Sequence, residues 1–277
     1  MATTSSLVTN GLNPVFADID AQTLNINPNI IENMISKSTS AIVPVHVFSN
    51  ACEVERIDAI AKKNNLKVIY DAAHSFNVKY KGESILTYGD ISAISFHATK
   101  VFHSIEGGAL IINNDELVEK VRYLINFGIK NTEEIPELGT NAKMNEFEAA
   151  MGLCVLNDIQ ELNKKRKKIY YLYVQELEKY VTLQKMNTHS VQNHSYLPII
   201  LKNTKQLKMV EDGLKKENIY PRRYFYPSLD TLKYIKPKQY CKISRDISSR
   251  ILCLPMYPEL ETINVKKICK IIIENLC

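Results

Sequence analysis

Short apolar runs alternate with stretches of helical periodicity over the first half of the chain. Apolar runs at 41–47, 67–70, 91–96 and 109–112 predict buried strands. Between the first two runs, residues 53–64 carry apolar side chains at helical spacing, which predicts an amphipathic helix. Strands that alternate with helices favour an open α/β sheet with mostly parallel strands and flanking helices.

The pattern changes in the second half of the chain. Residues 145–180 contain no Gly or Pro after Gly152, which predicts one long helix that joins two domains. Beyond it we expect a strand at 191–201, a helix at 204–218, an irregular loop at 221–227 and a last helix at 265–276. We therefore expect a partial large domain over 1–157 and a smaller α+β domain over 158–277.

Composition limits the class of protein. The chain has 277 residues, 45% hydrophobic and 23% charged, which is typical of a globular protein. A net charge of +5 is mild and does not indicate binding to nucleic acid. Six cysteines are scattered without the spacing of a metal site, so we expect reduced and mostly buried thiols. We see no apolar run of membrane-spanning length and no secretory signal, and we expect a cytoplasmic location without membrane contact.

Two residues at predicted strand ends suggest a specific chemistry. Asp71 ends the second strand and is followed by small residues, while Lys100 follows the third strand. In open α/β sheets, reactive groups lie at the carboxyl ends of the strands. A lysine that forms a Schiff base and an acid that faces a pyridinium nitrogen are what pyridoxal phosphate requires. Taken singly, Asp71 is better explained as a helix cap or a surface carboxylate, and Lys100 as a solvated surface amine.

The surrounding segments resemble the DegT/DnrJ/EryC1/StrS sugar aminotransferase family. The matching segments are 71–76 (DAAHSF), 89–91 (GDI), 95–100 (SFHATK), 106–109 (EGGA), 126–128 (NFG) and 139–150 (GTNAKMNEFEAA), with further similarity at 14–20 (PVFADID, a strand in the family) and 250–258 (RILCLPMYP). The resemblance spans nearly the whole chain, and the combined motifs are highly specific. The pattern is nearest to members that make 4-amino-4,6-dideoxyglucose or 3-amino sugars on dTDP.

The resemblance implies a fold type I enzyme with pyridoxal 5′-phosphate as cofactor. Such an enzyme moves an amino group, usually from L-glutamate, to a nucleotide-linked keto-deoxysugar, in amino-sugar and surface polysaccharide (O-antigen) biosynthesis. Lys100 would form the Schiff base with the cofactor and then shuttle a proton. Asp71 would pair with the pyridinium nitrogen. A truncated non-catalytic relative is the alternative, and a sugar dehydratase is less favoured because dehydratases replace the lysine at position 100 with histidine.

Other site residues follow from the same resemblance. Ala73 would lie under the cofactor ring, His74 would contact the ring hydroxyl, and Ser95 would bind the phosphate. Asn141 would reach that phosphate from a partner subunit, so the resemblance implies a homodimer. Lys143 stands where many members have arginine, a change that we expect to be tolerated.

The match begins inside the family's pattern. The family's first strands and its Ser/Gly-Thr loop at a helix N-terminus, which gives backbone N–H groups to the cofactor phosphate, precede the matched part. Each hydrogen bond to a charged group that is lost is worth about 1.5–3 kcal/mol. We therefore expect weak or absent activity from this chain alone.

Three further segments carry local expectations. The basic run 164–168 is expected to be the solvated face of the long helix. In the turn at 48–51, where the family usually has Gly and Pro, Asn50 is expected to take the left-handed conformation. Arg222 and Arg223 either meet a nucleotide diphosphate or lie solvated in a loop.

Overall fold

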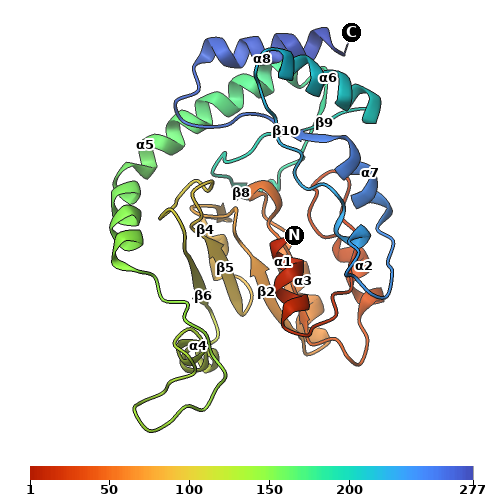
Figure 1. The fold of residues 1–277 in the computed structure, drawn as a ribbon. Coiled ribbons are helices and arrows are strands. Elements are labelled where there is room, and N and C mark those ends of the chain that lie inside the picture. Colours follow the sequence, from red (N-terminus) through yellow and green to blue (C-terminus); the bar gives the residue numbers. More distant parts are fainter. Residues whose placement is uncertain (277) are drawn as a thin grey trace.

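A four-stranded sheet forms the centre of the first half of the chain, in a computed structural model that describes residues 1–276 (Figure 1). Its strands, in spatial order, are β1 (Ala41–Ile42), β2 (Lys67–Asp71), β5 (Ile91–Ser95) and β6 (Gly108–Ile112). The first three run parallel, whereas β6 is antiparallel to β5. The expected α/β sheet with mostly parallel strands is confirmed. Its central parallel strands end at Asp71 and Ser95.

Helices accompany this sheet, and one of them packs directly on it. They are α1 (Ala2–Thr9), α2 (Pro28–Met34), α3 (Val54–Lys63) and α4 (Val118–Leu124). The predicted helix at 53–64 is confirmed as α3, which buries Val54, Ile57 and Ala61 against Val68 and Tyr70 of β2. Each fully buried aliphatic side chain of this kind contributes about 1.5–3 kcal/mol. This packing fixes β2, and with it the position of Asp71, against the helical layer.

The predicted long helix is α5 (Glu146–Leu177). Its first turn is held by a capping box, in which the Asn145 side chain accepts a hydrogen bond from the backbone of Glu148 and the Glu148 side chain accepts one in return. Although α5 has 32 residues, neither it nor any other helix of residues 1–276 is apolar over enough of its length to cross a membrane.

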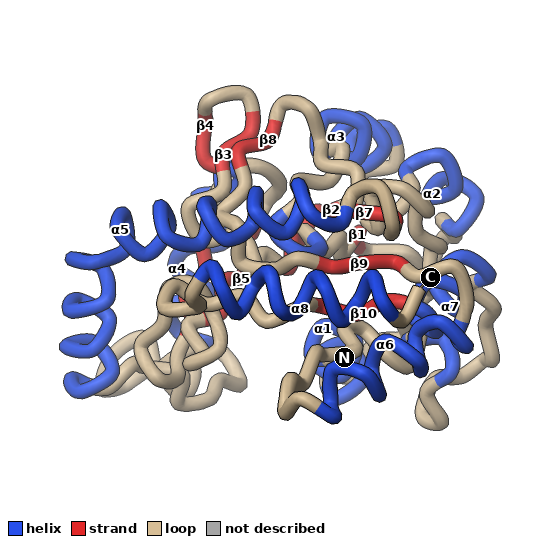
Figure 2. Tube along the Cα trace, turned by 90° about the horizontal axis from the view of Figure 1, so that it is seen from above, coloured by secondary structure: helices blue, strands red, loops and turns tan. Residues whose placement is uncertain are grey.

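The last turns of α5 form a second layer with the C-terminal elements. These are β7 (Thr182–Leu183), β9 (Pro198–Ile200), α6 (Thr204–Lys216), α7 (Lys242–Arg250), β10 (Ile251–Cys253) and α8 (Thr262–Glu274). Figure 2 shows α5 and α8 side by side over β9 and β10. Their shared core contains Tyr173, Leu177, Ile199, Leu214 and Ile272, all fully buried.

Separate hydrophobic cores support a division into two domains. One core gathers residues 31–85, and another gathers residues 169–272. A smaller cluster joins Leu24 and Phe48 to C-terminal residues such as Ile251. A small sheet of β4 (Glu83–Ser84), β3 (Lys79–Tyr80) and β8 (Ser190–Val191) also connects the two parts. We propose a boundary near residue 157, inside α5.

Three predicted strands are wrong or too long. The run 41–47 gives only β1 and a single bridge from Val45 to Asp71, because Pro44 has no N–H for a ladder. The run 191–201 is strand only near its ends, since His194 has a left-handed backbone with φ of 54°. Segment 14–20 contributes one isolated bridge from Ile19.

The turn at 48–51 also differs from expectation. Phe48 and Ser49 take the left-handed conformation, with φ of 56° and 64°, whereas Asn50 has an extended backbone with φ of −82°. The Asn50 amide instead donates hydrogen bonds to the carbonyl oxygens of Thr23 (3.1 Å) and Lys185 (3.0 Å). The asparagine therefore anchors the turn through its side chain rather than through its backbone.

The cysteines agree with the expectation of reduced thiols. Cys52, Cys241, Cys253 and Cys269 are free and buried, and Cys154 is free and exposed. Cys277 lies outside the described residues.

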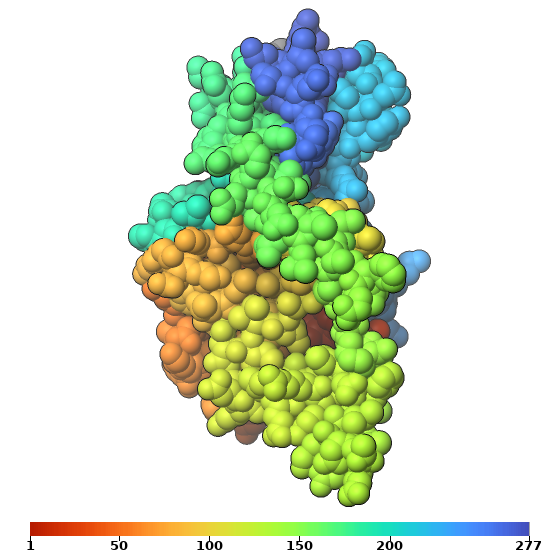
Figure 3. Space-filling view, turned by 90° about the vertical axis from the view of Figure 1, so that its left-hand side faces the viewer, coloured from red at the N-terminus to blue at the C-terminus, as the bar shows by residue number. Residues whose placement is uncertain are grey.

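One segment, 127–156, exposes many large apolar side chains. They include Leu138, which is 96% exposed, Phe147 at 87%, Ile135 at 68% and Leu153 at 65%. Figure 3 shows this segment, in yellow-green and green, along one outer face of the molecule. Monomeric proteins rarely expose so many neighbouring apolar groups without a partner.

Candidate active site

The carboxylate of Asp71 is fixed at the end of β2. One oxygen, Oδ1, accepts a hydrogen bond from the backbone N–H of Ala73 at 3.0 Å. The other, Oδ2, accepts one from the Thr3 hydroxyl at 2.5 Å. Asp71 also pairs in register with Ala93 of the neighbouring parallel strand β5. The carboxylate therefore lies at the edge of the sheet where the parallel strands end, because β5 ends only two residues after Ala93.

Lys100 lies in the loop that joins β5 to β6. The loop is closed by hydrogen bonds from Phe96 N–H to the Gly107 carbonyl (2.8 Å) and from Ser104 N–H to the Phe96 carbonyl (3.0 Å). Gly107 has φ of 130°, and a Cβ there would lie 2.8 Å from Met144 Cε. This position therefore favours glycine, and the loop that carries Lys100 is held in one conformation.

Electrostatics link Lys100 to Asp71 and His74. Burial lowers the pKa of the Lys100 amine below its usual value, and the nearby negative charge of Asp71 opposes this shift. Burial, helped by the positive charge of Lys100, lowers the pKa of His74 to about 3. The lysine therefore loses its proton more easily than a solvated lysine, as a nucleophilic amine must. His74 is neutral at physiological pH.

The imidazole of His74 has a defined tautomer. Its Nδ1 accepts a hydrogen bond from the Phe48 backbone N–H at 3.3 Å, so the ring proton resides on Nε2. The ring is enclosed by Tyr196, with centroids 4.5 Å apart, and by Phe225 at 5.7 Å. A neutral ring with a fixed Nε2–H can donate to an acceptor oxygen.

The remaining predicted residues divide into two groups. Ala73 follows Asp71 directly, and Ser95 ends β5, where its Oγ accepts a hydrogen bond from the His97 backbone at 3.3 Å. These residues lie at the same sheet edge as Asp71 and Lys100. Asn141 is exposed in the loop between α4 and α5 and does not line the cavity beside Lys100. Among residues 1–276, no hydrogen bond joins Asn141 to any of the other five predicted residues, and its backbone bridge is to Asn126.

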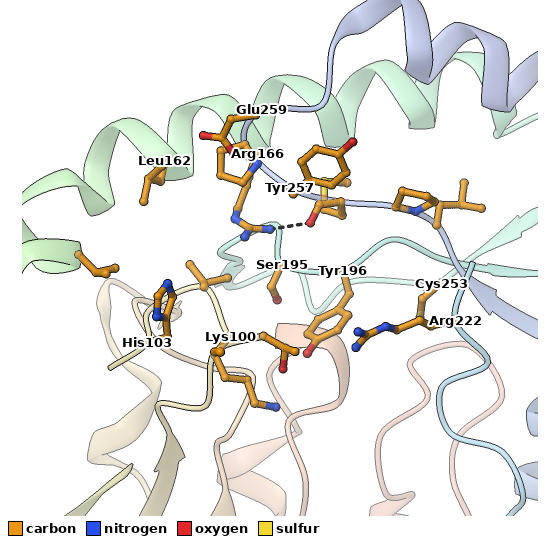
Figure 4. Close-up of a pocket in the computed structure, with 18 of the residues that line it drawn as sticks. Lys100, His103, Leu162, Arg166, Ser195, Tyr196, Arg222, Cys253, Tyr257 and Glu259 are labelled. Atoms are coloured by element: carbon orange, nitrogen blue, oxygen red, sulfur yellow. Dashed lines mark hydrogen bonds between the residues drawn. The ribbon is translucent and has the colours of Figure 1, made fainter. Parts of the chain in front are cut away.

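A cavity of about 580 Å³ lies beside Lys100, between α5 and the segment after β10 (Figure 4). Its wall includes His103, Arg166, Ser195, Tyr196, Arg222 and Tyr257. Among residues 1–276, three buried polar atoms of this wall have no hydrogen-bond partner: His103 Nδ1, Arg166 Nε and Ser195 Oγ. Buried polar atoms are normally paired, so this wall is suited to a polar ligand.

Sequence reasoning missed three residues of this region. None of them belongs to a motif. Through the fold, Thr3 contacts Asp71, Tyr196 contacts His74, and Ser195 lines the same cavity as Lys100. The prediction that the basic run 164–168 is a solvated helix face is wrong for Arg166. Its guanidinium points into the cavity, where Nη1 donates to the Met256 carbonyl at 2.8 Å.

The donor set fits pyridoxal phosphate. A carboxylate at a buried strand end suits a protonated ring nitrogen, and the small side chain of Ala73 leaves room for a flat ring. An amine with a lowered pKa suits an aldehyde, and Ser95 supplies a hydroxyl for the phosphate. The adjoining cavity gives space for a second reactant.

Comparison with known proteins agrees with this interpretation. The sequence pattern described as the DegT/DnrJ/EryC1/StrS aminotransferase family matches residues 1–273. A dTDP-4-amino-4,6-dideoxy-D-glucose transaminase of Shigella dysenteriae is 42% identical over 269 residues, or 95% of this chain and 73% of that protein. A transaminase of the same name from Escherichia coli is 36% identical, covering 100% of this chain and 77% of that protein.

Solved structures give the same result. The crystal structure of DesI with its TDP-sugar product has a TM-score of 0.92 and 30% identity, covering 100% of this chain and 72% of that chain. PseC of Helicobacter pylori, an aminotransferase, has a TM-score of 0.92 and 26% identity, covering 99% and 76% of the two chains. This chain therefore belongs to the DegT/DnrJ/EryC1/StrS family of sugar aminotransferases, which use pyridoxal phosphate as their cofactor.

Proposed function

We propose that this protein transfers an amino group from L-glutamate to the keto group of a dTDP-linked 4-keto-6-deoxysugar. The observation that carries the proposal is the partly buried amine of Lys100, which lies within electrostatic reach of Asp71 and beside a 580 Å³ cavity. The relative from Shigella dysenteriae, at 42% identity, supports the choice of sugar nucleotide. The product would serve cytoplasmic synthesis of an amino sugar for a surface polysaccharide.

Each residue of the sheet edge has a distinct task in this proposal. When bound, pyridoxal phosphate supplies an electron sink that stabilises negative charge on the substrate carbon. The Asp71 carboxylate, held by Thr3 and Ala73, keeps the ring nitrogen protonated. The Lys100 Nζ binds the cofactor and moves a proton to and from the substrate carbon. His74 donates from Nε2 to the ring hydroxyl, and Ser95 binds the phosphate.

A second copy of the chain completes the site in this proposal. Segment 127–156 exposes a row of apolar side chains, and Asn141 lies within it. Apolar groups at this density favour burial against a partner. In a symmetric dimer the same segment covers its counterpart, so each chain can present its Asn141 to the other chain's cofactor phosphate.

A complementation experiment tests the shared site. Lys100→Ala and Asn141→Ala homodimers should each have low activity. When equal amounts are unfolded together and refolded, half of the dimers are mixed, and about a quarter of all sites regain both residues. The activity of the refolded mixture should therefore rise well above the sum of the activities of the two separate variants. No rise, in a sample shown to contain mixed dimers, would contradict a site shared between subunits.

The overall proposal is tested with the purified chain and excess pyridoxal phosphate. We expect a visible absorption band. We also expect formation of 2-oxoglutarate from L-glutamate that depends on a dTDP-linked 4-keto-6-deoxysugar, at the low rate expected of this chain alone. Sugars linked to UDP or GDP serve as matched alternatives, because they differ in the nucleotide. Covalent attachment of the cofactor without any amino transfer would favour a non-catalytic relative. Absence of both signals would contradict the proposal.

A further inference from the structure

Arg166 differs from the four basic residues that surround it in the sequence. Its neighbours on α5 are exposed lysines at positions 164, 165, 167 and 168. Arg166 instead turns under the helix, and its guanidinium enters the cavity beside Lys100 (Figure 4). A solvated helix face does not explain a basic side chain that is directed inward.

The charge of this guanidinium is poorly compensated. Among residues 1–276, no carboxylate lies within 4 Å of Arg166, although Asp158 and Glu259 also line the cavity. Burial lowers the pKa of Arg166, and the charge of Glu259 only partly opposes this. An arginine stays protonated at physiological pH in spite of such a shift. A partly buried cation without a close counter-ion is costly, which favours an anion at this place.

The guanidinium is also oriented and has donors to spare. Nη1 donates to the Met256 carbonyl at 2.8 Å, which fixes the direction of the planar group. The Nε–H is buried without a partner in the described chain, and so is the nearby Ser195 Oγ of the same cavity. Arginine presents its N–H groups as a fork that matches the two oxygens of a carboxylate or a phosphate.

We propose that Arg166 binds an anionic oxygen group of a substrate on the cavity wall that faces Lys100. The inference rests on the proposed aminotransferase function and adds a binding residue to it. Two sources carry this chemistry: a carboxylate of the amino donor, and the diphosphate of the sugar nucleotide. Ser195 completes the subsite as a neutral donor.

Binding measurements distinguish the two sources. The probes are 2-oxoglutarate for the carboxylates and dTDP for the diphosphate, each titrated calorimetrically into protein loaded with pyridoxal phosphate. Arg166→Gln should weaken one probe by about 10- to 100-fold, the range for loss of a hydrogen-bonded charged partner. The affinity of Arg166→Lys for that probe should lie between the affinities of Arg166→Gln and the wild type, because lysine keeps the charge but loses the forked arrangement of N–H donors. Lys165→Gln removes the same charge one residue away and should leave both affinities unchanged.

Kinetics separate binding from a structural role. Arg166→Gln should raise KM for the matching substrate alone, since glutamine can still donate to the Met256 carbonyl and preserve the local fold. If Arg166→Gln binds both probes as the wild type does, the inference is overturned, while the aminotransferase proposal stands. Failure of the wild-type chain to attach the cofactor would instead overturn the aminotransferase proposal.

A measurement on the wild-type protein covers the case in which the variants do not fold. Phenylglyoxal modifies accessible guanidinium groups, and mass spectrometry locates the modified residue. Saturating dTDP or 2-oxoglutarate should slow modification of Arg166, whereas the exposed Arg56 on α3 serves as the internal reference. An unchanged rate at Arg166 with both saturating probes would refute the subsite.

Discussion

Replacing Lys100 with alanine is expected to abolish covalent attachment of pyridoxal phosphate. In the wild-type chain, borohydride reduction after loading should leave the cofactor mass on the peptide that contains Lys100. The variant should show no such mass there, because the partly buried amine with its lowered pKa is removed. Amino transfer should fall by about 10²–10⁴-fold, the range for loss of a positioned proton-transfer group.

Two further variants make this result specific. Lys100→Arg keeps a positive charge near Asp71 but has no nucleophilic amine, so it should also fail to attach the cofactor. Lys165→Ala alters an exposed lysine of α5 and should behave as the wild type. Cofactor found on another lysine in the wild-type protein, with Lys100 unmodified, would show that the site is elsewhere.

The parts of the fold that were predicted correctly depend on local patterns. Helix α3 shows apolar residues at helical spacing, and α5 lacks glycine and proline after Gly152. The short apolar runs 67–70 and 91–96 place the strand ends within one residue of Asp71 and Ser95. The run 41–47 was predicted too long because apolar character does not reveal where hydrogen-bond partners end, and Pro44 interrupts the ladder.

The parts of the site that were not predicted depend on contacts between distant residues. Thr3 reaches Asp71 across 68 positions, and the contact of Arg166 with Met256 spans 90. Neither contact leaves a periodic signal or a motif in the sequence. Arg166 was misinterpreted for a further reason: four lysines around it made the segment look uniformly solvated. Only the packing of α5 over the cavity shows which of the five side chains turns inward.

Asp71→Asn is expected to have two opposite effects. Amino transfer should fall by about 10²–10³-fold, the range for loss of one preorganised electrostatic group, because asparagine cannot hold the ring nitrogen protonated. Attachment of the cofactor to Lys100 should nevertheless proceed at lower pH than in the wild type. The negative charge of Asp71 raises the pKa of Lys100 in the wild type, so its removal lowers that pKa further. A larger fraction of the amine is then neutral at a given pH, and the neutral amine is the form that attacks an aldehyde.

The measurement is the rate of cofactor attachment against pH, recorded beside the rate of amino transfer. The midpoint of the attachment profile should move to lower pH in Asp71→Asn, while transfer falls at every pH. Asp71→Glu retains the charge one methylene further out, so its attachment profile should resemble that of the wild type even if transfer is reduced. Thr3→Val removes the hydroxyl donor to Asp71 Oδ2 and tests orientation alone. An Asp71→Asn variant with near wild-type transfer would show that this carboxylate does not face the ring nitrogen, since loss of the charge would then leave the electron sink intact.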